Sequence, residues 1–430
     1  MKFNLVTTLV CTLVCSLVYP LCGRAEELGL SLATAEARLD SGNLEIISAR
    51  QQLEAARADV IGAGARPNPT LGVAVSSISP SRGIGSGRLN DKQVDSVLRI
   101  DQLIERGGKR ELRIATAEQL VQAAEQNLEE TRRLQRLALH QAYYDLKLGE
   151  EKQRISRENS RLQNEALAAS EKRLAAGDIP SAEVVRLRVE ALRAANDANT
   201  AASDAVRARQ GLALLIGAGR EAPSAWTASD PWPVDLPPGL NAQLDADTLS
   251  ARPNVRAAQF RVSAAERARE LARQLRTRDV TVGAQVERFP PDTGVTYGFT
   301  ISVPLQINYQ YQGEIARAEA DLTTAMAERE REMTMATADY RRAAADLQAA
   351  AERRRRLNEE LLPQARSSLD SAEFAYKRGA ISLLDVLDAR RTLRSVELEA
   401  AASAADFAKA RASWLAATGR SASTPAATQR

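Results

Sequence analysis

Two aspartates spaced three positions apart are the residues of this sequence best suited to act on an ion. Asp385 and Asp388 lie in LLDVLDA (383–389), a segment that is otherwise apolar and follows Gly379 closely. On a helix this spacing puts both carboxylates on one face. Acidic side chains are also favoured in the first turn of a helix by the backbone dipole. The pair therefore fits an ordinary helix start as well as an ion site.

Other patterns that could carry chemistry are weaker. The chain has one histidine, His140, whereas transition-metal sites generally need several nitrogen or sulfur donors, so we expect it to lie on a helix surface or between helices and not to bind a metal. GIGSG (83–87) lies between two expected strands with no helix after it, which indicates a loop and not a nucleotide site. RRRR (353–356) follows Glu352 and indicates an ion-paired helix surface. We find no catalytic triad, paired catalytic acids or metal cluster, and predict no enzyme activity and no cofactor.

Composition indicates a protein of long helices. Lys and Arg number 58 against 55 Asp and Glu, so no strong basic field favours nucleic-acid binding. Aromatic residues make up only 4%, while alanine, leucine, arginine and glutamate recur throughout, which suits close-packed helices better than a thick core.

The first 25 residues have the pattern of a signal peptide. Lys2 precedes an apolar run at 5–18, and small residues at 23–25 favour cleavage after Ala25. All three cysteines precede that position, so the mature chain would have no thiol. Cys22 is an alternative lipid-anchor cysteine, although Leu21 stands where a small residue is normally required. We therefore expect a bacterial envelope protein.

The mature sequence contains one unit twice. AAGDIPSAEVVRLR (175–188) aligns with KRGAISLLDVLDAR (377–390) at a constant shift of 202, and a shift of 211 carries Gly72 onto Gly283 upstream. We predict a first repeat over 26–219, a linker or equatorial segment over 220–248, a second repeat over 249–419, and a disordered tail over 420–430.

Each repeat has the predicted order helix, two strands, very long helix, glycine turn and return helix. Proline positions and alternation set the expected ranges. In the first repeat these are 31–65, 70–76, 94–102, 107–176 and 181–217. In the second they are 250–276, 280–288, 295–305, 311–378 and 381–418, with a kink at Pro363. Helices of roughly 100 Å are too long for a compact globule, so they must form a coiled coil or a helical tube.

The two expected strands of the second repeat alternate strictly between apolar and polar residues. In GVTYGFTISVPL (294–305), one face carries residues such as Tyr297 and Phe299, and the other carries Gly298 and Thr300. This pattern fits membrane barrel strands, and also an antiparallel sheet on a soluble core. Four strands are too few for a closed barrel, which needs about eight or more. If the strands span a membrane, several chains must share one barrel, and three chains would supply twelve strands.

The sequence resembles the TolC-type outer-membrane channel family over essentially the whole mature chain. The resemblance rests on the duplicated unit, QLIERGGKREL (102–112), the tips AAGDIPS and YKRGAIS, LLPQA (361–365) and the terminal LAATG (415–419). The ERGGKR and LLPQA segments look most like the heavy-metal, CzcC-like branch.

The resemblance implies an α+β membrane protein with a long α-helical coiled-coil tunnel and a β-barrel shared within a homotrimer. It implies an outer-membrane conduit with a periplasmic extension, working with a periplasmic adaptor and an inner-membrane RND-type pump. The implied substrates are divalent heavy-metal cations. Alternatives are a duct for drug efflux or type I protein secretion and, in another class, a periplasmic coiled-coil adaptor or scaffold.

The resemblance also assigns roles to individual residues. It places Asp385 and Asp388 at a pore constriction, as stacked rings that favour cations and have some pKa values raised by crowding. The family's basic latch residue is replaced by Ile381, so Lys377 or Arg378 would have to substitute. The implied tip gate is Glu183 and Tyr376, and the implied hairpin tips that meet the adaptor are Gly177, Ile179, Gly379 and Ile381.

Overall fold

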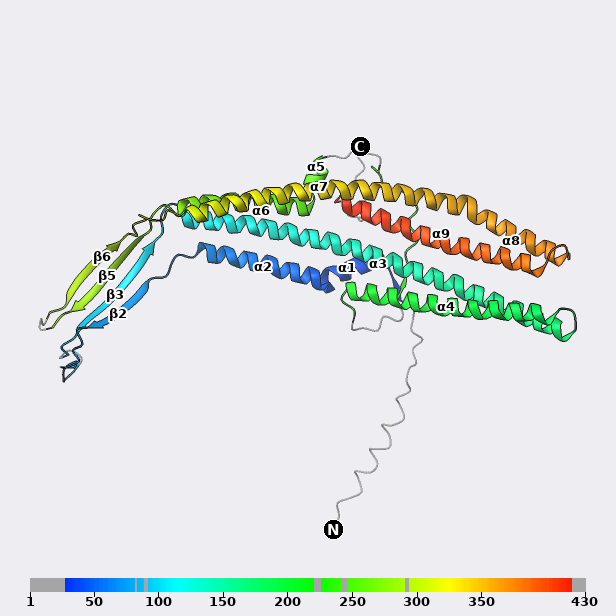
Figure 1. Cartoon of the computed structure of the whole chain (residues 1–430), viewed down its shortest axis with the longest axis horizontal. Coiled ribbons are helices and arrows are strands. Elements are labelled where there is room, and N and C mark those ends of the chain that lie inside the picture. The colour runs from blue at the N-terminus through cyan, green and yellow to red at the C-terminus, as the bar shows by residue number, and fades with distance from the viewer. Residues whose placement is uncertain are drawn as a thin grey trace, which may run out of the picture. The chain divides into compact units, whose positions relative to one another are not determined.

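A computed structural model describes residues 28–81, 83–88, 92–219, 226–240, 246–290 and 294–419. The expected signal peptide with its cysteines and the expected tail lie outside these ranges. The chain divides into two compact units, each made of separate stretches of sequence (Figure 1). One unit comprises 1–38, 141–233 and 357–405, and the other comprises 39–140, 234–356 and 406–430. We call them the hairpin unit and the sheet unit.

The sheet unit contains a four-stranded antiparallel sheet. Its order is β2-β3-β5-β6, and the register pairs Thr70 with Asp101, Asp101 with Gly283, and Gly283 with Thr300. The strands are β2 (Thr70–Ser76), β3 (Asp95–Ile104), β5 (Val280–Arg288) and β6 (Thr296–Ser302). All four strands therefore lie within a few residues of the ranges predicted from the sequence.

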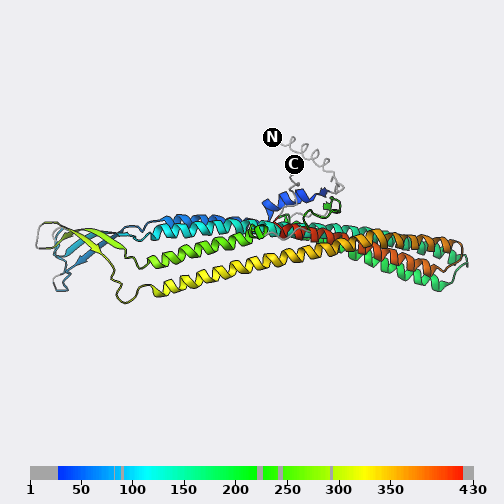
Figure 2. The ribbon, with the colours of Figure 1, turned by 90° about the horizontal axis from the view of Figure 1, so that it is seen from above.

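Helices continue from the sheet within the same unit. They are α2 (Leu44–Gly64), the first part of α3 (Lys109–Ala175), α5 (Ala246–Ser250), α6 (Pro253–Gln274), α7 (Gln312–Arg356) and the end of α9 (Leu383–Ala417). Figures 1 and 2 show α6 running beside α7. Their core is rich in alanine, with Leu347, Phe407 and Trp414 as the large buried side chains of one cluster. Small residues allow the helices to approach closely, which suits a thin helical wall.

The prediction of one continuous helix over 31–65 is wrong, because the structure has two helices there. α1 (Leu32–Gly42) ends at a glycine, and Asn43 caps the next helix. The buried Asn43 side chain accepts hydrogen bonds from the backbone N–H of Glu45 (3.0 Å) and Ile46 (3.1 Å). Ser-Gly-Asn is therefore a helix stop followed by a helix start.

The hairpin unit contains two helical hairpins. One joins the second part of α3 to α4 (Ser181–Leu215), and the other joins α8 (Leu362–Lys377) to α9. The same ion pair ties each hairpin. Arg188 Nη2 lies 2.7 Å from Glu171 Oε1, and Arg390 Nη2 lies 2.7 Å from Glu373 Oε1. Both pairs are related by the shift of 202, so the repeat extends to matching side-chain contacts.

The helix expected at 311–378 is not continuous, since a π-helical turn at Leu357–Leu361 separates α7 from α8. Pro363 follows this turn and lies in the first turn of α8. Proline has no N–H and its ring clashes with the carbonyl four residues earlier, and a π turn relieves that clash. The predicted interruption is present, with its distortion just before the proline.

The expected linker is anchored in its described part. β4 (Trp226–Ala228) pairs in parallel with β1 (Leu28–Leu30). The buried Tyr143 hydroxyl donates to the carbonyl of Leu30 (3.0 Å) and accepts from the backbone N–H of Asp230 (3.0 Å). Burial raises the pKa of Tyr143. Within the residues that the structure places, no helix is long and apolar enough to cross a membrane.

Candidate functional site

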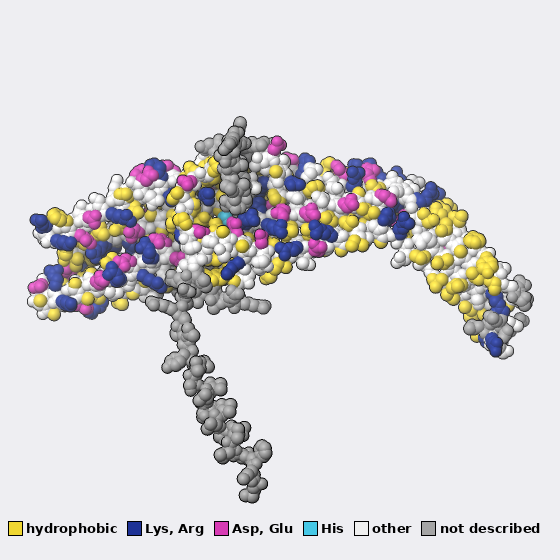
Figure 3. All heavy atoms as spheres, turned by 180° about the vertical axis from the view of Figure 1, so that it is seen from behind, with side chains coloured by type: hydrophobic (Ala, Val, Ile, Leu, Met, Phe, Trp, Pro, Cys, Tyr) yellow, Lys and Arg dark blue, Asp and Glu magenta, His cyan; other side chains and the backbone are white. Residues whose placement is uncertain are grey.

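One face of the sheet is apolar and exposed. The side chains of Phe299 and Val73 are 85% and 72% exposed, and the register aligns neighbours of the same kind on every strand. They are Leu71, Val73 and Val75 on β2, Leu98 and Ile100 on β3, Val286 on β5, and Tyr297, Phe299 and Ile301 on β6. Figure 3 shows hydrophobic side chains, in yellow, gathered over the sheet among white atoms. An exposed apolar patch on every strand of one sheet marks a surface that contacts lipid or protein.

The opposite face is polar and internally bonded. Arg99 Nε lies 2.7 Å from Asp101 Oδ1, and Arg99 Nη2 donates to Thr300 Oγ1 at 3.1 Å. Gly283 lies between Asp101 and Thr300 in the register, and a Cβ atom there would collide with both side chains. The glycine therefore makes room for a polar network that crosses three strands.

Both edges of the sheet are open among the described residues. β2 pairs only with β3, and β6 pairs only with β5. Unpaired strand edges present rows of free N–H and C=O groups, which natural proteins cover or pair. A further strand must therefore complete each edge if the sheet lies in a membrane.

Both hairpin tips are glycine-terminated helix ends of one type. Gly177 and Gly379 have φ of 80° and 72°, a region that favours glycine. At each tip the glycine N–H donates three residues back and the following N–H donates five residues back, all at 2.9 Å. This is the Schellman motif. Ile179 is only 9% exposed and Ile381 is half-buried, so in this conformation other residues form most of the tip surfaces.

Asp385 forms a capping box with Ser382. Its Oδ2 accepts from the backbone N–H of Ser382 at 2.9 Å and from the Ser382 hydroxyl at 2.7 Å. This contact closes the start of α9. The Ser382 hydroxyl, and then its N–H, hold the pKa of Asp385 below its usual value. The expected rise from crowding would need further copies of the chain, so it stays a prediction. The first repeat has Pro180 in place of Ser382 and lacks the box.

Asp388 lies one turn further along α9, and its side chain is 74% exposed. It pairs with Arg391 (3.1 Å), which also contacts Glu190 of α4 (2.7 Å). Arg394 and Asp197 form a second pair between the same helices, at 2.5 Å. These two contacts join the hairpins within one subunit. No local sequence pattern indicates these contacts, because their residues lie about 200 positions apart.

The expected gate residues are not in mutual contact. The Tyr376 hydroxyl accepts a hydrogen bond from Arg173 Nη1 at 3.1 Å, which joins α8 to α3. Glu183 is half-buried, and its side chain has no polar partner within the described part of the chain. The structure therefore joins the two tips through Arg173, without Glu183.

The structure also shows the surroundings of His140 and of the arginines at 353–356. His140 is 6% exposed. Among the described residues, no three His, Cys, Asp or Glu side chains are grouped to hold a metal. The ion-paired surface expected at 353–356 is confirmed, with Arg353 on Asp406, Arg355 and Arg356 on Glu352, and Arg354 over the ring of Phe407.

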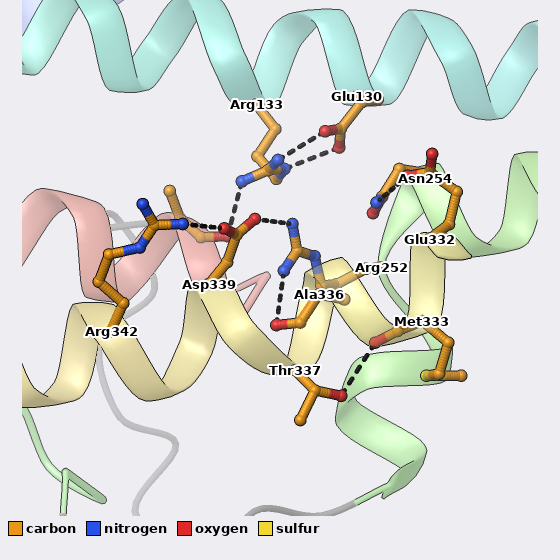
Figure 4. A network of polar contacts seen from close by, with 11 residues as sticks. Glu130, Arg133, Arg252, Asn254, Glu332, Met333, Ala336, Thr337, Asp339 and Arg342 are labelled. Atoms are coloured by element: carbon orange, nitrogen blue, oxygen red, sulfur yellow. Dashed lines mark hydrogen bonds and ion pairs between the residues drawn. The ribbon is translucent and has the colours of Figure 1, made fainter. Parts of the chain in front are cut away.

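A buried arginine organises a polar network that the sequence did not reveal (Figure 4). Arg252 is 2% exposed, donates to the carbonyl of Ala336 at 3.2 Å and lies 3.6 Å from Asp339. Burial lowers its pKa. Arg133 contacts Glu130 on α3 and donates to the carbonyl of Ala416 near the end of α9 (3.1 Å). These contacts join the start of α6 to α7, and α3 to the end of α9.

Comparison with known proteins decides the family. The chain matches the family described as Outer membrane efflux protein over residues 34–218 and 246–420. It belongs to that family. The cobalt-zinc-cadmium resistance protein CzcC of Cupriavidus metallidurans is 24% identical over 377 residues, covering 85% of this chain and 84% of CzcC.

Solved structures show the same fold. One is CusC, whose structures describe folding and transmembrane channel formation. The match has a TM-score of 0.76 at 20% identity and covers 91% of this chain and 92% of the CusC chain. The open state of the Neisseria gonorrhoeae MtrE outer membrane channel has a TM-score of 0.72 at 19% identity, covering 92% of both chains.

Family membership confirms several expectations together. This outer membrane efflux protein is a channel component of a tripartite system and is not an enzyme. It is located in the outer membrane, with a periplasmic helical extension. The alternative of a periplasmic adaptor or scaffold is set aside, because the matched family consists of outer-membrane channels.

Proposed function

We propose that this chain is one third of a passive conduit for divalent heavy-metal cations. The main support for a conduit is the four-stranded sheet. It has an exposed apolar face, a hydrogen-bonded polar face and two open edges among the described residues. Four strands from each of three copies would close a twelve-stranded barrel in which β6 of one copy pairs with β2 of the next. The apolar face would meet lipid, and the polar face would line the lumen.

The helical part would continue the conduit across the periplasm. The hairpins would form a tunnel whose tips, at Gly177, Ile179, Gly379 and Ile381, meet a periplasmic adaptor and an inner-membrane RND-type pump. The pump would supply the energy. Domain limits at 26–219 and 249–419 remain a proposal, supported by the matching ion pairs of the two hairpins.

Asp385 and Asp388 would narrow the tunnel near the tips. In a trimer each would form a ring of three carboxylates, which favours cations over anions. Glu183 and Tyr376 would take part in opening, together with the Glu190–Arg391 and Asp197–Arg394 contacts that hold the hairpins together. Arg391 would partly offset the Asp388 charge.

The metal substrate is supported by the similarity to CzcC, whose name records resistance to cobalt, zinc and cadmium. Deleting the gene in its host should lower the tolerated concentration of these ions and raise their amount in the cell, and the intact gene should restore both. If metal tolerance is unchanged while sensitivity to hydrophobic drugs or the loss of a secreted protein appears, the conduit serves the alternative substrates, drug efflux or type I secretion.

A further inference from the structure

One end of the sheet carries arginines whose charges are not neutralised by the described chain. Arg66 precedes β2 by four positions, Arg106 follows β3 by two, and Arg278 precedes β5 by two. All three side chains are exposed, and none has a polar partner among the described residues. We call these three residues the arginine rim.

The register places the three rim arginines at the same end of the sheet, beside the ends of the strands. Thr70 pairs with Asp101 and Ile104 pairs with Val280, so the start of β2, the end of β3 and the start of β5 lie together. Two hydrogen bonds fix the flanking segments. Gln102 donates to the carbonyl of Pro67 at 2.9 Å, and the N–H of Arg106 donates to Asp279 at 2.9 Å.

Carboxylates near the rim are already engaged by other cations. Asp279 lies 2.9 Å from the buried ammonium group of Lys109, and Glu105 is held by a two-pronged contact with Arg113. The Arg113 hydrogen bonds keep the pKa of Glu105 below its usual value. These acids therefore fix the junction between strands and helices and leave the rim as excess positive charge.

The rim borders the exposed apolar face directly. Ile104 and Leu71 are 47% and 69% exposed, within a few residues of Arg106 and Arg66. After β6, which finishes at the same end of the sheet, the chain reaches Tyr309, which is 50% exposed. The centre of its ring lies 6.0 Å from that of Tyr311. Figure 3 shows dark blue side chains where the helices meet the yellow surface. Membrane proteins place apolar side chains in the hydrocarbon core of the bilayer, and tyrosine and arginine at its interface with water. The same order of side chains is found here.

We propose that the arginine rim binds the headgroups of anionic phospholipids in the periplasm-facing leaflet of the outer membrane. An exposed guanidinium group can form two parallel hydrogen bonds with a phosphate, and an excess of arginine attracts anionic over zwitterionic headgroups. Three copies of the chain would place nine such groups around the base of one barrel. The bound lipids would fix the depth at which the barrel sits.

The test uses the full-length protein reconstituted in vesicles that contain spin-labelled phosphatidylglycerol or phosphatidylcholine. The ratio of the two association constants gives the lipid preference. Wild type should prefer phosphatidylglycerol, and the preference should weaken at high salt. Arg106→Gln should weaken the association of phosphatidylglycerol with the rim roughly five-fold, and replacing all three rim arginines by glutamine should remove the preference. Lysine at all three positions should retain much of it.

A matched control removes three exposed arginines that lie within helices and also have no side-chain partner in the described part of the chain. These are Arg186, Arg256 and Arg341, each changed to Gln. This variant should keep the preference of wild type. The proposal is overturned if wild type shows no preference, or if the two triple variants behave alike. It is equally overturned if the rim variant keeps its preference but loses its oligomer in detergent, which would show that the arginines pair with a neighbouring copy.

Discussion

Asp385 carries two properties that a substitution can separate. Its carboxylate caps α9 through Ser382. In the proposed tunnel its charge would also act on a passing ion. Alanine would remove both, so a loss of function in that variant would have two explanations. Asparagine keeps an oxygen that can accept from Ser382 and removes only the charge. Asp388 has no capping role, and its exposed carboxylate carries a charge that pairs with Arg391 at 3.1 Å.

The charge hypothesis is tested by Asp385→Asn combined with Asp388→Asn. Single-channel recordings of the purified protein should lose most of their preference for cations and their block by multivalent cations, because the carboxylate rings are neutralised. Asp370→Asn, an exposed change on α8, should leave both properties as in wild type. Unchanged selectivity in the double variant would show that these residues do not line the constriction.

At the scale of elements, two glycines related by the repeat are in different surroundings. Gly283 lies between Asp101 and Thr300, whereas the nearest atom to a Cβ on Gly72 would be a backbone oxygen at 3.9 Å. Gly283→Ala should therefore destabilise the sheet by about 1–3 kcal/mol, a cost typical of overpacking. Gly72→Ala should change stability by less than about 0.5 kcal/mol. Thermal unfolding of both variants in detergent checks this, and equal effects would contradict the network on the polar face.

The hairpin contacts make a second prediction for the elements. Arg391→Ala with Arg394→Ala removes both ion pairs between α4 and α9. Each exposed pair is worth only about 0.2–1 kcal/mol, but three subunits would lose two pairs each. The conductance of the resting channel should rise several-fold in planar bilayers. Arg188→Ala, which breaks a pair within one hairpin, is the control and should leave the conductance low.

Local patterns predicted most elements, and tertiary register explains the remainder. Alternation located β5 and β6, and the absence of proline indicated the length of α3, because these signals lie within the segment itself. The break at Asn43 needed the capping geometry. The pairing of β1 with β4, the Arg252 network and the Glu190–Arg391 contact join residues far apart in sequence, and no local pattern encodes their register. For the candidate site, the sequence pointed to Asp385 and Asp388 but not to the partners they have.

For the whole molecule, we infer that three copies of the chain close one barrel. The apolar face, the polar face and the open edges of β2 and β6 all belong to a sheet that is incomplete in one chain. When edge-to-edge pairing closes a ring, the assembly has a fixed number of chains. When the ring does not close, further chains can be added without limit. The final size of the assembly therefore distinguishes a barrel from a chain of sheets.

Cysteine cross-linking between the open edges of β2 and β6 tests whether three copies form a closed barrel. All three natural cysteines precede the expected cleavage site, so engineered pairs would be the only thiols of the mature chain. One cysteine is placed at Leu71, Val73 or Val75 of β2 and the other at Tyr297, Phe299 or Ile301 of β6, all on the apolar face. After oxidation in membranes, the best pair should give covalent dimers and trimers on a denaturing gel and nothing larger. Only monomers for every pair, or a ladder that extends beyond three chains, would contradict the trimeric barrel.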